Sequence, residues 1–214
     1  MIKDKTMGYK NVLFLGNSLL LGMFDLYGMC STDPESDYAY YITRELKKRE
    51  PDCKISKLRI SAFEACESTE DFDAWFDASK HYFNSDLDLI SLQMLDNVND
   101  EKRQAAFLSN FPELLRRLRA MCPNARIVWT YGWYMKHAVF DAAAAIAESF
   151  GIERIDIRSA HTKENESYSG QLCLNAAGDK VVVSDEWITH PGNDGMRAVA
   201  DIMIAAIFKG EKNV

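Results

Sequence analysis

The sequence predicts a single three-layer α/β/α domain with a five-stranded parallel sheet. Three observations support this prediction. Short apolar runs typical of strands alternate with helical segments, the 214 residues suffice for one ordinary α/β domain, and no linker or internal repeat divides them. We therefore expect one domain over residues 1–214, with the strand order 2-1-3-4-5 of flavodoxin-like folds.

Five strands and five helices are expected in alternation. The expected strands are Asn11–Leu15, Lys54–Ile60, Leu87–Met94, Arg126–Tyr131 and Glu153–Ile157. The expected helices are Tyr38–Arg49, Glu70–Tyr82, Glu101–Met121, Phe140–Phe150 and Gly195–Phe208. Each helix carries apolar residues at helical spacing. The segment Lys163–Trp187 interrupts the alternation, and its glycine-containing pairs predict a loop with a small hairpin.

The charge and composition narrow the classes of partner. The formal net charge is −7, and 47% of the residues are hydrophobic, which is typical of a globular protein with a sizeable core. Nucleic acids and anionic membranes need basic surface, so we expect neither as a partner. No targeting segment or membrane span is visible in the sequence, and the expected location is the cytoplasm.

The cysteines and histidines predict neither a metal site nor a disulfide framework. The five cysteines include no C-x-x-C pair and their number is odd, which favours free thiols in a reducing compartment. The four histidines are scattered along the chain, whereas a zinc site needs clustered ligands. No metal and no organic cofactor is expected.

The first expected strand ends in Gly16-Asn17-Ser18-Leu19. This position places the Ser18 hydroxyl at the carboxyl edge of the sheet, where open α/β folds bind their ligands. A serine hydroxyl becomes a strong nucleophile only beside a base, and the oxyanion that forms needs hydrogen-bond donors. The alternative interpretation is that Ser18 simply caps the next helix.

Two further residues are placed to serve such a nucleophile. His190 stands before Pro191 in the turn that leads to the last helix, and it is the candidate base. Asn97 follows the third expected strand, so its side-chain amide falls at the same edge of the sheet and can donate a hydrogen bond to an oxyanion. Each also has a plain interpretation, His190 as a turn residue and Asn97 as a loop residue.

These segments resemble the sequence blocks of the SGNH, or GDSL-type, hydrolase family. Gly16-Asn17-Ser18-Leu19 is similar to the family's first block, Asn97 stands where the family places an oxyanion asparagine, and His190-Pro191 matches the last block. The blocks come in the family's order and span nearly the whole chain. The resemblance implies the SGNH hydrolase fold, a Ser18 nucleophile, a His190 base, and hydrolysis of a small carboxylic ester such as an O-acetylated carbohydrate.

Two positions depart from the family pattern. The family has an aspartate three residues before the histidine, where this chain has Trp187. Asp185, Glu186 or a backbone carbonyl can orient the imidazole instead, and Asp185 is preferred because its short side chain leads into a bend. The family's glycine block after the second strand is also missing. Glu64 is the candidate there for a backbone N–H donor, with its carboxylate pointing away from the oxyanion.

The expected catalytic residues are Ser18, His190 and Asp185, with an oxyanion hole from Ser18, Glu64 and Asn97. The expected activity is hydrolysis of a small-molecule ester by acyl transfer. The missing aspartate keeps a second hypothesis open, a carbohydrate- or acyl-binding protein that has this fold without the activity. A third hypothesis is a flavin- or nucleotide-binding module, but the segment after the first strand is too apolar for a phosphate-binding loop.

Three residues follow the fourth expected strand: Trp133, Tyr134 and Lys136. Their place at the carboxyl edge makes them candidates for the wall of the pocket. They have an equally plain interpretation as packing and solvated loop residues. The sequence leaves both interpretations open.

Overall fold

The computed structural model describes residues 8–134 and 137–209. Its parallel strands are β1 (Asn11–Gly16), β2 (Lys54–Arg59), β3 (Leu89–Gln93), β4 (Arg126–Tyr131) and β5 (Glu153–Asp156). They form one sheet in the order β2-β1-β3-β4-β5. The predicted fold class and strand order are therefore confirmed.

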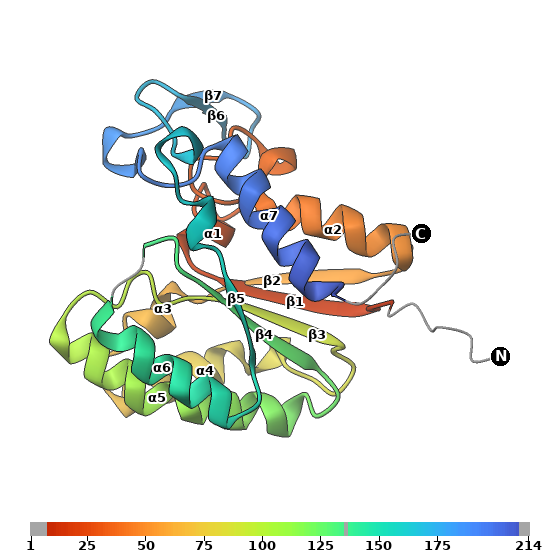
Figure 1. Ribbon diagram of the computed structural model, residues 1–214, viewed down its shortest axis with the longest axis vertical. Helices are drawn as coiled ribbons and strands as arrows, with labels where there is room; N and C mark the ends of the chain where they lie inside the picture. The colour runs from red at the N-terminus through yellow and green to blue at the C-terminus, as the bar shows by residue number, and fades with distance from the viewer. Residues whose placement is uncertain (1–7, 135–136, 210–214) are drawn as a thin grey trace.

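Helices cover both faces of this sheet, as Figure 1 shows. One face carries α2 (Tyr38–Arg49) and α7 (Asn193–Ile207), and the other carries α4 (Thr69–Ser79), α5 (Glu101–Met121) and α6 (His137–Ser149). Two four-residue helices, α1 (Ser18–Leu21) and α3 (Ser61–Glu64), follow β1 and β2 and have no counterpart among the expected elements. Four residues are too few to show a helical period in the sequence.

The side chains of β1 alternate between two cores. Val12 and Phe14 belong to the apolar cluster that includes α2 and α7, whereas Leu13 and Leu15 belong to the cluster that includes α4, α5 and α6. Successive side chains of a strand point to opposite faces, so a strand with helices on both sides must be apolar on both. The continuous apolar run before Gly16 is therefore what a strand in this position requires.

The expected elements agree with the observed ones except at some ends. The bounds of α2, α5 and β4 are those predicted. The expected helix Glu70–Tyr82 consists of α4 and a following 3₁₀ turn, Lys80–Tyr82. Helices α6 and α7 begin two or more residues before their expected starts, because the first turn of a helix contributes little to its apolar stripe. Within the described ranges, no helix combines the length and the apolar character needed to cross a membrane.

The predicted hairpin is formed by β6 (Leu172–Leu174) and β7 (Lys180–Val182), which pair antiparallel outside the main sheet. In Figure 1 it lies beyond α1, on the side away from the helices α4 to α6. Its residue Cys173 and the following Val183 pack against Met23 and Tyr27, which come directly after α1. The segment that follows Ser18 and the segment that leads to the last helix are thus packed together.

Candidate active site

Ser18 is the first residue of α1 and comes directly after β1 and the Asn17 that caps the helix. The Oδ1 of Asn17 accepts a hydrogen bond from the N–H of Leu19 at 3.2 Å, so the interpretation of Ser18 as the cap is wrong. Gly16 permits this tight turn, because a Cβ atom there would lie 2.5 Å from the Cβ of Leu20. The Ser18 hydroxyl is consequently available to a partner outside its own helix.

That partner is His190. The Oγ of Ser18 lies 3.1 Å from Nε2 of His190, although 172 positions separate the two residues. On the other side of the ring, Nδ1 lies 3.0 Å from the main-chain carbonyl oxygen of Trp187. A carbonyl oxygen can only accept, so Nδ1 carries the proton and Nε2 presents its lone pair to the serine hydroxyl. This is the tautomer that a general base requires.

The protonation of His190 also suits a base. Burial lowers the pKa of His190 to about 4, and the hydrogen bond to the carbonyl of Trp187 acts in the opposite direction. Burial has this effect because it disfavours the charged imidazolium. The ring is therefore neutral at neutral pH and able to accept the proton of Ser18.

The preferred choice of Asp185 to orient His190 is wrong. The Oδ1 of Asp185 accepts a hydrogen bond from the hydroxyl of Ser169 at 2.7 Å, on an exposed part of the loop. Asp185–Trp187 is a 3₁₀ turn, and its geometry presents the carbonyl of its last residue to the imidazole. The carbonyl of Trp187 is thus the orienting group, which was the third of the three alternatives. Glu186 is exposed.

Two of the three residues after β4 lie beside the site. The ring of Tyr134 packs edge-on against the imidazole of His190, with 5.3 Å between the ring centroids, and its hydroxyl lies 3.2 Å from Oγ1 of Thr189. Trp133 is buried, and its Nε1 donates to the carbonyl of Thr189 at 3.0 Å. Both residues are thus in contact with the segment that carries His190. Lys136 lies outside the described residues.

A pair of buried carboxyl groups lies next to the residue that precedes Ser18. Glu64 is 1% exposed and Asp96 is 7% exposed. The Nδ2 of Asn17 joins them, at 3.3 Å from Oε1 of Glu64 and 3.0 Å from Oδ2 of Asp96. Burial and the neighbouring charge of Asp96 raise the pKa of Glu64 to about 7, and burial likewise raises the pKa of Asp96.

The structure corrects the expected role of Glu64. Its main-chain N–H donates to the carbonyl of Ile60 at 3.2 Å within the turn of α3, so it is not a donor for an oxyanion. Its carboxylate does not point away either, because Oε2 accepts a hydrogen bond from Nδ2 of Asn97 at 2.7 Å. Asn97 is half-buried, and the second hydrogen of its Nδ2 remains for another acceptor. The main-chain N–H of Ser18 has no acceptor within the described chain.

Asp96 and Gln93 were not predicted from the sequence as residues of the site. The Oε1 of Gln93 accepts from the N–H of Asn17 at 3.1 Å, and its Nε2 donates to Oδ2 of Asp96 at 2.6 Å. The other oxygen of Asp96 accepts from the N–H of Tyr134 at 3.0 Å. These bonds tie the turn after β1 to the ends of β3 and β4. The available signal was the polar Gln93 at the end of an otherwise apolar strand.

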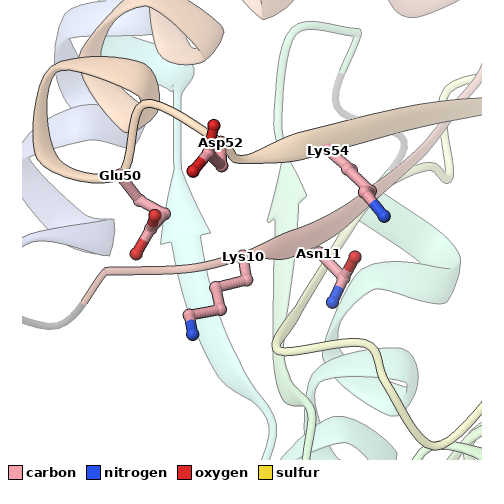
Figure 2. A pocket seen from close by; sticks show the side chains of 5 residues that line it. All are labelled: Lys10, Asn11, Glu50, Asp52 and Lys54. Atoms are coloured by element: carbon pink, nitrogen blue, oxygen red, sulfur yellow. The ribbon is translucent and has the colours of Figure 1, made fainter.

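A hollow lies at the opposite, amino edge of the sheet (Figure 2). It is lined by Lys10, Asn11, Glu50, Asp52 and Lys54, at the starts of β1 and β2. The ammonium groups of Lys10 and Lys54 extend in different directions in Figure 2, and two carboxylates share the same wall. This hollow therefore does not offer the converging cations that an anion site needs.

Neither a protein-family model nor a curated protein sequence matches this chain. Solved structures do match it. A protein assigned as a GDSL-like lipase, from Parabacteroides merdae, has 16% identity and a TM-score of 0.60 over 93% of this chain and 96% of its own. Phospholipase A1 from Streptomyces albidoflavus has 15% identity and a TM-score of 0.53, over 91% of this chain and 98% of its own.

An acetyl xylan esterase from Butyrivibrio proteoclasticus shares 14% identity with a TM-score of 0.52, over 92% of this chain and 63% of its own length. Identities this low show a shared fold. They leave the chemistry to be argued from the residues of the site itself. The chain has the three-layer α/β/α fold of the SGNH, or GDSL-type, hydrolases, as its sequence blocks predicted.

Proposed function

We propose that this protein is a serine esterase that cleaves a small carboxylic ester through an acyl-enzyme on Ser18. The observation that carries the proposal is the line of contacts from Oγ of Ser18 through the ring of His190 to the carbonyl of Trp187. It supplies a nucleophile, a neutral base in the correct tautomer, and a group that orients the base. The fold shared with lipases and esterases supports the same reaction class.

The proposed reaction has two halves. Oγ of Ser18 attacks the ester carbonyl while Nε2 of His190 takes the hydroxyl proton, and the tetrahedral intermediate collapses when His190 protonates the leaving alcohol. Water then attacks the acyl-serine with its proton passing to His190, which returns a proton to Ser18 as the acid leaves. In both halves, the N–H of Ser18 and the Nδ2 of Asn97 donate to the oxyanion.

Nδ1 of His190 faces a carbonyl and not a carboxylate, which lowers the expected reaction rate but leaves the sequence of reaction steps unchanged. The carbonyl of Trp187 holds the imidazole in place and selects its tautomer, which is part of the role of the aspartate in a full triad. It supplies a dipole and no full charge, so the imidazolium that forms in the transition state is stabilised less. We therefore expect a functional Ser-His dyad with a lower rate than a complete triad.

The finer proposal concerns the ester itself. Tyr134 places an aromatic edge beside His190, and an amphipathic ring of this kind suits contact with a sugar as well as with an acyl chain. An acetyl xylan esterase and a carbohydrate esterase share the fold. We take an O-acetylated carbohydrate as the substrate class, with preference for acetyl over longer acyl groups. A comparison of turnover on acetyl, butyryl and decanoyl p-nitrophenyl esters tests this preference.

Labelling with a fluorophosphonate probe, followed by peptide mapping, tests the central proposal. The probe reacts only with an activated serine, so the expected label is on Ser18. Ser18→Ala should lose both the label and the turnover of p-nitrophenyl acetate, and His190→Ala should lose both because the base is gone. A wild-type protein that is neither labelled nor active would overturn the proposal.

The second candidate is a carbohydrate- or acyl-binding protein on the same fold. The observation that favours it is the carbonyl of Trp187 in the place of a carboxylate. A structure of this fold carries the description that the active site of a carbohydrate esterase has divergent catalytic and non-catalytic binding functions. Calorimetric binding of an acetylated xylo-oligosaccharide, unaltered by Ser18→Ala and without any acetate release, would favour this candidate.

A further inference from the structure

We propose that the carboxylate of Glu64 is a positioning residue that holds the side-chain amide of Asn97 with Nδ2, and not Oδ1, toward the reacting ester. The inference rests on the proposed esterase function and deepens it. Glu64 itself does not touch the reacting atoms. It acts through Asn97, whose Nδ2 donates to its carboxylate at 2.7 Å.

In each of its side-chain hydrogen bonds, the carboxylate of Glu64 is the acceptor. Oε1 accepts hydrogen bonds from the main-chain N–H of Leu95 at 2.5 Å and from Nδ2 of Asn17 at 3.3 Å. Oε2 accepts from Nδ2 of Asn97 at 2.7 Å. Both ends of the side chain therefore face donors, and only a group that accepts at both ends satisfies them. Among the side chains that fit this space, an ionised carboxylate is that group.

This arrangement selects one orientation of the Asn97 amide. The amide has nearly the same shape when its oxygen and nitrogen exchange places, so only hydrogen bonding distinguishes the two orientations. With Oε2 of Glu64 as a pure acceptor beside it, Nδ2 is the favoured neighbour. One hydrogen of Nδ2 then binds Glu64 and the other points outward, where it can donate to an oxyanion.

The turn at Leu95 has a strained backbone, and the hydrogen bonds of Glu64 and Asp96 hold it in place. Leu95 has a φ of +105°, which is costly for a residue with a side chain, and its N–H is one of the donors to Glu64. The next residue, Asp96, is fixed by bonds from Asn17, Gln93 and the N–H of Tyr134. Glu64 and Asp96 thus hold the consecutive residues that place Asn97. The strained backbone of Leu95 is thus held by the hydrogen bonds of Glu64 and of Asp96, and it lies next to Asn97.

Stability alone does not account for this carboxylate. Glu64 is buried beside a second acid, and its hydrogen-bond partners in the described chain are all neutral. A buried charge without a countercharge is costly, and such arrangements cluster at functional sites. The titratable group that faces Glu64 is Asp96, which in turn interacts with His161. The donors that surround Glu64 include Nδ2 of Asn97, so we assign to the charged carboxylate the role of holding that amide in place.

The isosteric variant Glu64→Gln tests the inference. Gln accepts at one end and donates at the other, so Asn97 is expected to turn its Oδ1 toward the new donor and lose its outward N–H. At pH 8 we expect kcat on p-nitrophenyl acetate to fall roughly 10²-fold, the scale for one oxyanion donor, with little change in KM. An unchanged or higher kcat overturns the inference.

A double-mutant cycle separates positioning from a general structural role. If Glu64 acts only through Asn97, the double variant Glu64→Gln/Asn97→Ala should be no slower than Asn97→Ala alone. Multiplicative losses would mean that Glu64 does not act through Asn97, and the inference would fall. Asn110→Ala is the matched control, because Asn110 is a buried amide that donates to the carbonyl of Ser68 away from the site. It should lower the melting temperature without lowering kcat.

A spectroscopic measurement keeps the inference separate from the proposed function. The side-chain amide resonances of Asn97, assigned by their loss in Asn97→Ala, should move strongly in Glu64→Gln and little in Asn110→Ala. If the wild type shows neither turnover nor labelling, the proposed function fails while these resonances still decide whether Glu64 holds Asn97. Should the Gln variant not fold, Glu64→Asp serves instead, since a side chain one methylene shorter cannot span Leu95 and Asn97. Unmoved resonances overturn the inference.

Discussion

The main-chain carbonyl of Trp187 lies 3.0 Å from Nδ1 of His190, in the place that a carboxylate occupies in a full Ser-His-Asp triad. The same oxygen also accepts from the main-chain N–H of His190 at 2.8 Å and from the thiol of Cys30 at 3.2 Å. Three donors on one carbonyl fix its direction and so the direction of the imidazole. The orienting group is therefore part of the backbone and does not depend on which side chain position 187 carries.

The first prediction concerns the acid that the sequence favoured. Asp185→Asn should leave kcat on p-nitrophenyl acetate within about twofold of the wild type, whereas loss of a true triad aspartate costs about 10⁴-fold. The reason is that Asp185 hydrogen-bonds Ser169 and not His190. Glu186→Gln is the matched control and should behave the same way. A loss of orders of magnitude in Asp185→Asn would restore the aspartate to the catalytic machinery.

The second prediction concerns the oxyanion. Asn97→Ala should lower kcat by roughly 10²- to 10³-fold with little change in KM, because the lost hydrogen bond forms in the transition state and not in the bound substrate. Steady-state kinetics with p-nitrophenyl acetate measures both constants. Labelling of Ser18 by a fluorophosphonate should persist, more slowly, since the nucleophile and base remain. Unchanged turnover would reduce Asn97 to a loop residue.

The third prediction concerns the pH dependence of kcat/KM. His190 must be neutral to act as a base, and its pKa of about 4 places the final loss of activity near that pH. Glu64 must be ionised to hold Asn97, and its pKa of about 7 predicts an earlier, partial fall as the pH drops through 7. Glu64→Gln mimics the protonated acid, so its profile should lack the upper step and keep the lower one. An upper step that survives in Glu64→Gln would assign that step to another group.

The fourth prediction concerns stability. The folded-state pKa of Glu64 lies above its usual 4.5, so the folded protein holds this proton more tightly than the unfolded chain between pH 4.5 and about 7. The contribution of Glu64 to the free energy of unfolding is therefore greatest at low pH and is lost as the pH rises through 7. Urea unfolding at a series of pH values should show this fall in the wild type. In Glu64→Gln the fall should be smaller, because the raised pKa of Asp96 remains to cause part of it, and a fall of unchanged size would contradict the assignment.

The fold could be predicted from the sequence because it depends on periodicity. The apolar run that ends at Gly16 and the stripe along Glu101–Met121 are patterns that burial imposes on any strand or helix in these positions. Ser18 and His190 could be predicted because topology brings the ends of such elements to one edge of the sheet. Their 3.1 Å separation agrees with that placement.

The rest of the site leaves little trace in the sequence. Every residue has a carbonyl, so nothing distinguishes that of Trp187 until the 3₁₀ turn is known. Glu64 ends a helix of only four residues, which has no period to detect, and its partners come from two other segments of the chain, at Asn17 and at 95–97. Hydrogen bonding between distant side chains depends on exact geometry. A single sequence records which residues are present but not which way they turn.

The site joins the two ends of the fold. Ser18 follows the first strand, whereas His190 lies three residues before the start of α7. Met196 and Val199 of that helix pack in the same core as Phe14 of β1. A growing polypeptide therefore exposes its serine long before the matching base leaves the ribosome. The proposed Ser-His pair cannot form until the chain has been synthesised as far as α7 and that helix has docked, so the proposed hydrolysis depends on residues from both ends of the described fold.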